Sequence, residues 1–156
     1  MKTIKFQLKR EILAAGLKKH ESVIDDFQTR IREMTATDGN VNEEEYDSHT
    51  QSQKAETYTE VSLLTEQLQY ALHELNELRR LEWDIEEDHQ IVAFGTVVVT
   101  DQGTFFVSSS IEQFTVNGDE IFGLSVLSPL YKRMKGKKVG DSFKLGDKQC
   151  VIKEIF

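Results

Sequence analysis

Five carboxylates gather within ten residues of the chain, and no basic residue interrupts them. They are Asp38, Glu43, Glu44, Glu45 and Asp47. Acidic side chains in the first turn of a helix interact favourably with its dipole, by roughly 0.3–1 kcal/mol each. That effect does not explain five carboxylates that repel one another at one place. The segment is therefore either a solvated acidic cap or a group that engages a metal ion or a catalytic centre.

A cluster of basic residues lies in the C-terminal part of the chain. It consists of Lys132, Arg133, Lys135, Lys137 and Lys138. Such a cluster can dock on an acidic protein surface or contact nucleic acid. The alternative is that these side chains only solvate a short helix and the turn after it.

The chain of 156 residues has a net charge of −8, and the acidic residues are concentrated in its N-terminal part. Residues 1–90 hold 20 Asp and Glu against 11 Lys and Arg, whereas residues 91–156 hold seven against eight. An acidic surface argues against direct binding of the N-terminal part along nucleic acid. It suits a partner with a basic surface, or a metal ion.

Several classes of protein are disfavoured by the sequence. No apolar run approaches the roughly 20 residues that cross a bilayer, and the first ten residues lack the apolar core of a signal peptide. Cys150 is the only cysteine, which excludes an intramolecular disulfide, and its apolar surroundings predict a buried thiol. No glycine-rich nucleotide loop, paired His/Cys site or Ser/His/Asp arrangement favours an independent enzyme. We expect a cytoplasmic monomer that has no membrane partner and binds no cofactor by itself.

Residues 6–80 are predicted to form two long helices that pack side by side. Two seams repeat at alternating steps of three and four residues, as in paired helices. The first seam is Phe6, Arg10, Leu13, Leu17, His20, Ile24, Phe27, Ile31 and Met34, and the second is Val61, Leu64, Leu68, Ala71, Leu75 and Leu78. His20 at a seam position is expected to be a core histidine rather than a metal ligand.

The break between the two helices is expected near Gly39, a residue type that suits the position after a helix C-terminus. Asn42 can cap the second helix, and Glu45 three residues later completes a capping box. A short break between two long helices predicts an antiparallel hairpin, with an arm of roughly 40–45 Å.

The sequence changes character after an acidic join at residues 81–90. β-branched residues at 94–100 and 104–107 predict two strands, and residues 141–155 predict a closing hairpin. Between them, Ser128 predicts the N-cap of a short helix and Pro129 its first residue.

The expected fold class is therefore α+β. An antiparallel two-helix coiled-coil hairpin covers residues 1–83, and a small antiparallel β domain with one short helix covers residues 84–156. The hairpin is expected to be an arm.

The stretch from Leu124 to Asp141 combines a strand that ends in Ser128-Pro129, a short helix, and the sequence Gly-Lys-Lys-Val-Gly-Asp. This pattern, joined to a heptad hairpin of about 75 residues, resembles the GreA/GreB family of transcript-cleavage factors. The resemblance covers nearly the whole chain. It implies an FKBP-like fold for the C-terminal domain, without prolyl isomerase activity.

The resemblance also implies a partner, which is RNA polymerase. The C-terminal domain would dock at the rim of the polymerase secondary channel, through Ser128, Pro129 and the basic cluster. The arm would then bring its tip to the active centre, so that the polymerase cleaves backtracked RNA. The RNA 3′ end and DNA are expected to be reached only through the elongation complex.

In the family, two tip carboxylates help to hold a catalytic Mg²⁺. Asp38 and Glu43 are the expected ligands here, because they flank the turn, and the ion is expected only in the polymerase complex. Glu44 is a further candidate catalytic carboxylate. Mg²⁺ prefers such hard oxygen donors and keeps several water molecules.

The tip departs from the family pattern, which resembles Gly-Asp-Leu-x-Glu-Asn-Ala-Glu-Tyr. Asn40 follows Gly39 where the family has Asp, and the segment is one residue short, so either Asn42 or Glu43 takes the place of the first Glu. Two alternatives therefore stay open. One is a secondary-channel regulator or inhibitor that does not stimulate cleavage, and the other is a coiled-coil scaffold unrelated to polymerase.

Overall fold

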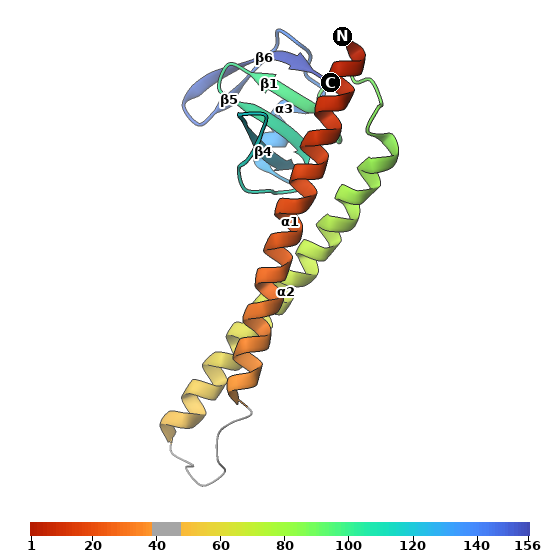
Figure 1. Ribbon diagram of the computed structural model, residues 1–156. Coiled ribbons are helices and arrows are strands. Elements are labelled where there is room, and N and C mark those ends of the chain that lie inside the picture. Colours follow the sequence, from red (N-terminus) through yellow and green to blue (C-terminus); the bar gives the residue numbers. More distant parts are fainter. Residues whose placement is uncertain (39–47) are drawn as a thin grey trace. The chain divides into compact units, whose positions relative to one another are not determined.

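The computed structural model describes the backbone of residues 1–38 and 48–156, and the side chains of residues 1–36 and 51–156 (Figure 1). Two long helices precede a sheet with one short helix. The elements are α1 (Lys2–Asp38), α2 (Ser48–Asp84), β1 (Val97–Thr100), β2 (Thr104–Ser108), β3 (Phe114–Val116), β4 (Asp119–Ser125), α3 (Pro129–Met134), β5 (Ser142–Leu145) and β6 (Lys148–Ile155). The expected α+β fold class is confirmed.

The chain divides into two compact units. The first contains Met1–His20 and Glu74–Phe156, and the second contains Glu21–His73. Compactness thus groups the N-terminal part of α1 and the C-terminal part of α2 with the sheet. The division into an arm over residues 1–83 and a domain over 84–156 stays a prediction.

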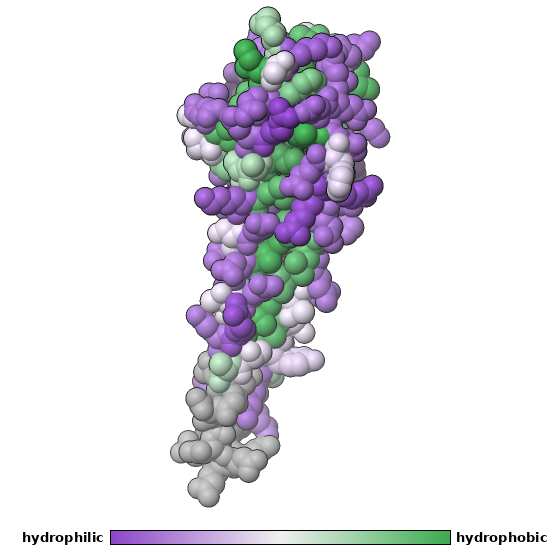
Figure 2. Space-filling model, turned by 45° about the vertical axis from the view of Figure 1, so that its right-hand side comes forward, coloured by the Kyte–Doolittle hydropathy of each residue, from purple (hydrophilic) through white to green (hydrophobic). Residues whose placement is uncertain are grey.

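Helices α1 and α2 run antiparallel, as the seams predict. In the second unit, Arg30 Nη2 lies 3.5 Å from Glu60 Oε1. In the first unit, Leu13 of α1 and Leu78 of α2 belong to one hydrophobic core, and Figure 1 shows the two helical segments of each unit running in opposite directions. Hydrophobic side chains gather in a stripe along the helices, between hydrophilic ones (Figure 2).

Most of the described seam positions are buried or half-buried, including Leu64, Ala71 and Leu75 on α2. His20 is buried in agreement with its expected role as a core histidine. Arg10 is the exception, because it is exposed and pairs with Glu86.

The acidic join lies against the start of α1. Helix α2 continues to Asp84, four residues beyond the predicted end. After it, Asp88 pairs with Lys2 at 2.7 Å, and Lys9 Nζ lies 3.4 Å from the carbonyl oxygen of Glu87. Two acidic residues of the join, Glu86 and Asp88, therefore have basic partners within the same compact unit.

The sheet has six strands in the order β3-β4-β2-β1-β6-β5. All neighbours are antiparallel except β2 and β4, which run parallel with Phe106 opposite Gly123. The expectation of a purely antiparallel sheet is wrong at this pair. The segment after β2 crosses β4 and returns through β3, which places β2 and β4 in the same direction.

Each face of the sheet has its own core. Val97, Phe106 and Phe156 pack with apolar residues of α1 and α2. Val98 and Phe105 point to the opposite face, where they pack with Tyr131 and Met134 of α3 and with residues of β5 and β6. Adjacent residues contribute to different cores because side chains alternate along a strand.

Candidate functional site

The start of α3 is fixed by the two residues that mark it in the sequence. Ser128 has an extended backbone, and its Oγ accepts a hydrogen bond from the Tyr131 amide at 3.1 Å. Pro129 occupies the first helical position, where a missing N–H costs nothing. Ser128 and Pro129 thus have a local structural role that accounts for their presence.

The loop after α3 is tied down at three points. The Gly136 amide donates to the Val92 carbonyl oxygen at 2.9 Å, and Gly136 has a φ of 75°, a conformation that favours glycine. The Lys138 amide donates to Asp141 Oδ2 at 2.8 Å. The Gly140 amide donates to the Ile152 carbonyl oxygen at 2.9 Å. The Gly-Lys-Lys-Val-Gly-Asp sequence therefore builds a fixed loop between α3 and β5.

The basic cluster lies on α3 and on this loop. Lys132, Lys135 and Lys138 are exposed, and Lys137 is half-buried. Within the described residues, no carboxylate forms an ion pair with these four lysines. The cluster is therefore a positive surface presented on a well-fixed backbone.

Two exposed apolar residues lie at the two ends of the segment that carries the basic cluster, and the sequence alone did not single them out. Leu127 precedes the cap of α3 and is 70% exposed, whereas Val139 lies in the loop and is 57% exposed. Leu127 lies in the turn after β4 and Val139 in the turn before β5, so neither belongs to the apolar periodicity of a helix or strand. Apolar residues within a turn were the available signal. With the three exposed lysines of the same segment they make up a candidate surface that we call the docking surface: Leu127, Lys132, Lys135, Lys138 and Val139.

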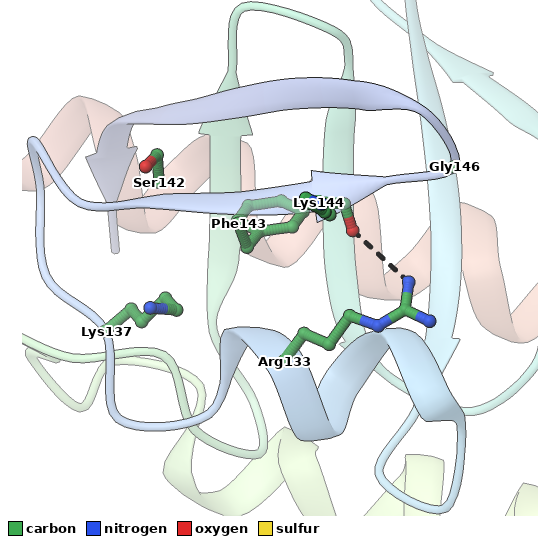
Figure 3. A pocket seen from close by; sticks show the side chains of 6 residues that line it. All are labelled: Arg133, Lys137, Ser142, Phe143, Lys144 and Gly146. Atoms are coloured by element: carbon green, nitrogen blue, oxygen red, sulfur yellow. Dashed lines mark hydrogen bonds between the residues drawn. The ribbon is translucent and has the colours of Figure 1, made fainter.

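A pocket of about 480 Å³ lies between α3 and β5 (Figure 3). It is lined by Arg133, Lys137, Ser142, Phe143, Lys144 and Gly146. Arg133 Nη1 donates to the Lys144 carbonyl oxygen at 3.3 Å. The structure thus divides the predicted basic cluster, because Arg133 and Lys137 line the pocket whereas the other three lysines do not.

The predicted tip residues cannot be placed in the same way. Asp38 is the last residue of α1, and its side chain lies outside the described residues, as do Glu43 and Glu44. Gly39, Asn42 and Glu45 of the predicted break also lie outside them. Among the described residues, no group of three His, Cys, Asp or Glu side chains is arranged to hold a metal ion.

None of the helices in residues 1–38 and 48–156 is both long enough and apolar enough to cross a bilayer.

No family model matches the chain, and no curated protein matches it. Among solved structures, the crystal structure of GreA factor homolog 1 (Gfh1) of Thermus thermophilus is similar at 17% identity and a TM-score of 0.34, covering 91% of this chain and 95% of that one. Thermus aquaticus Gfh1 is similar at 18% identity and a TM-score of 0.32, covering 91% and 94%. These likenesses concern the fold alone.

Proposed function

We propose that this chain is a Gre-type transcription elongation factor. It binds RNA polymerase at the secondary channel and inserts the segment between α1 and α2, so that the polymerase cleaves backtracked RNA. The observation that carries the proposal is the pairing of two 37-residue helices whose connection, together with Asp38 at the end of α1, holds five carboxylates and no basic residue. A helix of that length rises about 55 Å, which can deliver a tip into a deep channel.

The docking surface supplies the attachment to polymerase. Leu127 and Val139 give it exposed apolar area, and Lys132, Lys135 and Lys138 give it positive charge. Apolar contacts provide affinity at an interface, and complementary charges guide association and fix the orientation. The partner surface is therefore acidic with an apolar patch. Ser128 and Pro129 contribute by holding α3 in place, and their exposed atoms belong to the same interface.

The proposed chemistry belongs to the polymerase, and the chain supplies carboxylates to it. Asp38 and Glu43 are the proposed ligands of a Mg²⁺ ion shared with the polymerase, and Glu44 is a further candidate. A bound Mg²⁺ can activate water and stabilise charge on the phosphate. The chain is therefore proposed to be no enzyme by itself.

One observation favours a second candidate within the same class, a secondary-channel regulator that does not stimulate cleavage. Asn40 and Asn42 carry no charge, and at least one of them stands where the related pattern has a carboxylate. A neutral amide is a weaker ligand for Mg²⁺ than a carboxylate. A coiled-coil scaffold remains the alternative from a different class, and it predicts no affinity for polymerase.

The binding experiment compares the full chain with a charge-reversed variant. Lys132→Glu/Lys135→Glu/Lys138→Glu should weaken binding to core RNA polymerase by at least about tenfold. The new carboxylates would face the acidic surface proposed on the polymerase, and like charges across an interface repel. The matched control, Lys18→Glu/Lys148→Glu/Lys153→Glu, changes three lysines elsewhere and should bind nearly as the wild type does. Absence of any binding by the wild type would support the scaffold, and equal losses in the two variants would refute the docking surface.

A further inference from the structure

Strand β5 lies at an edge of the sheet, and β6 is its one hydrogen-bonded neighbour among the described strands. In an antiparallel pair, residues that bond to the neighbouring strand alternate with residues whose N–H and C=O groups point away from it. The Ile152 amide donates to the Asp141 carbonyl oxygen at 2.9 Å, so Asp141 belongs to the bonded set. The backbone groups of Ser142 and Lys144 therefore point away from β6.

The pocket between α3 and β5 lies along this free edge of the strand. Phe143 packs in the core with residues of α3, and side chains alternate along a strand, so the Lys144 side chain lies on the opposite face of β5. The Lys144 carbonyl oxygen is the group that meets α3, because it accepts from Arg133 Nη1 (Figure 3). The outward backbone groups of β5 thus face α3 across the pocket that they line.

The bond from Arg133 to the edge is weak enough to be exchanged. Its length of 3.3 Å lies beyond the usual range for N–H···O bonds, roughly 2.7–3.2 Å. A backbone amide of an incoming strand can take the Lys144 carbonyl oxygen in its place and release the guanidinium for another acceptor. The exchange leaves the carbonyl oxygen satisfied.

The charge around the pocket indicates which acceptor that is. Arg133 comes from α3 and Lys137 from the loop after it, across the pocket from β5 (Figure 3). No carboxylate of the described residues lines the pocket. A carboxylate is the acceptor that binds a guanidinium most strongly, and it can do so through two parallel hydrogen bonds. The surroundings of the edge therefore favour an acidic segment.

The size of the pocket suits a short stretch of chain. Its volume of about 480 Å³ lies within the range of ligand sites, roughly 300–1,000 Å³. An unpaired row of N–H and C=O groups is a template for another strand, and extended peptides bind to sheet edges in this way. We propose that an extended acidic segment of a partner protein binds in this pocket as an additional strand beside β5. Its main chain bonds to the backbone of Ser142 and Lys144, and one of its carboxylates pairs with Arg133.

The test is an NMR titration of the isotope-labelled full chain, so it does not depend on the proposed function. The probes are the capped peptide Val-Glu-Val-Glu-Val, its neutral match Val-Gln-Val-Gln-Val, and the acidic peptide N-methylated at its three central residues. The acidic peptide should bind saturably, with the largest amide shifts at Ser142 and Lys144. It should bind about tenfold more tightly than the neutral one, because a charged hydrogen bond is lost. N-methylation removes main-chain donors and should abolish binding.

Each probe has an outcome that would overturn part of the proposal. Undiminished binding of the N-methylated peptide would refute strand addition, and equal affinity for the neutral peptide would refute the acidic partner. No saturable binding of the acidic peptide at millimolar concentration would overturn the proposal as a whole. Self-association of the chain alone, measured by sedimentation and lost in Arg133→Gln, would mean that a second copy occupies the edge.

Three variants locate the site. Arg133→Gln should weaken binding of the acidic peptide roughly tenfold and leave the neutral peptide unaffected. Lys132→Gln removes a neighbouring charge outside the pocket and should change affinity less than twofold. Lys144→Gln should have an equally small effect, because Lys144 takes part through its backbone. Equal weakening by Arg133→Gln and Lys132→Gln would show non-specific attraction and overturn the assignment. Thermal unfolding of the variants verifies that α3 and the β5–β6 hairpin are intact.

Discussion

Lys9 is an almost fully buried lysine, at 1% exposure, in the unit that contains the sheet. Burial lowers the pKa of its ammonium from 10.5 to about 8, although the nearby carboxylates of Glu87 and Asp88 act in the opposite direction. Its ammonium also lies beside His89, whose pKa is lowered by burial and by the Lys9 charge. Desolvation therefore outweighs ion pairing at this site.

We expect Lys9→Met to stabilise the protein at pH 7, with an advantage that shrinks between pH 8 and 10.5. Below pH 8 the wild-type lysine is charged in both the folded and unfolded states, and the folded state bears the full desolvation cost. Above 10.5 it is neutral in both states, so that cost disappears. The effect is at most about 3 kcal/mol, and less where solvent screens the charge. Urea unfolding across this pH range measures it, with Lys18→Met as the exposed control; a pH-independent difference would contradict it.

Gly123 on β4 lies where the segment after β2 crosses the strand. An added Cβ would lie 2.5 Å from Ile111 Cβ and 2.7 Å from both Ile111 N and Ser109 O. Backbone atoms cannot rotate away, so we expect Gly123→Ala to lower the free energy of unfolding by about 3 kcal/mol. Gly16→Ala is the control. Its Cβ would meet the end of the Ile111 side chain at 3.2 Å, and alanine favours a helix. Equal stability of the two variants would show that residues 109–111 can move away from β4 and leave room for the added Cβ.

The environment of a single residue was predictable where its neighbours in the sequence determine it. The buried thiol of Cys150 is confirmed, since alternating apolar residues around it already placed it inside a strand. Gly123 could not be recognised in the same way. Its role depends on residues 109–111 crossing above it, and nothing in the strand itself records that crossing.

Two substitutions at Ser128, the N-cap of α3, can distinguish a role in protein stability from a role in polymerase binding. Ser128→Ala removes the bond to the Tyr131 amide and should lower the free energy of unfolding by about 1 kcal/mol. Ser128→Asn retains a capping oxygen and should keep nearly wild-type stability. Chemical denaturation distinguishes the two, with Ser110→Ala as an exposed control. If Ser128→Asn were as unstable as Ser128→Ala, the cap would not explain this position. If Ser128→Asn keeps its stability but binds polymerase more weakly, the loss comes from a contact of Ser128 with polymerase and not from unfolding of α3.

The elements were predictable to different degrees. Helices α1 and α2, and the cap of α3, follow from periodicity and capping residues that lie close together in sequence. The parallel pairing of β2 with β4 was missed, because strand direction depends on the path of the connection between them. The pocket was missed for a related reason: Arg133 and Lys144 are 11 residues apart and meet only when α3 packs beside β5.

At the scale of the whole molecule, we expect a shortened chain that contains only the first compact unit to fold. A short Gly/Ser loop that joins His20 to Glu74 keeps every residue of both cores. Residues 88–156 alone would lose the helical side of one core, namely Ile12, Leu13, Leu78, Leu81 and Ile85. Each such side chain contributes about 1.5–3 kcal/mol, and five together match the whole stability of a typical domain. Thermal unfolding should therefore be cooperative for the shortened chain and absent for residues 88–156. Equal stability of the two would contradict this division.

The α+β fold class was predictable from the sequence, but the division of the chain into its two compact units was not. The change from heptad to β-branched sequence near residue 90 suggested a boundary at 83/84. The core formed by Ile12, Leu78 and Phe106 joins segments from three regions of the chain, which no local pattern records. The tip carboxylates remain a prediction from sequence, since they lie outside the described residues.

The central claim is that the acidic segment between the helices acts at the polymerase active centre. The most direct measurement is transcript cleavage by a stalled, backtracked elongation complex with Mg²⁺, in the presence of wild type or Asp38→Asn/Glu43→Gln. The variant should bind polymerase normally and stimulate cleavage on the order of 100-fold less, because loss of metal ligands costs several kcal/mol in the transition state. The matched control Glu56→Gln/Glu66→Gln removes the same charge from exposed positions on α2 and should cleave as the wild type does. A wild-type protein that binds polymerase without stimulating cleavage, or a tip variant with full activity, would contradict the claim.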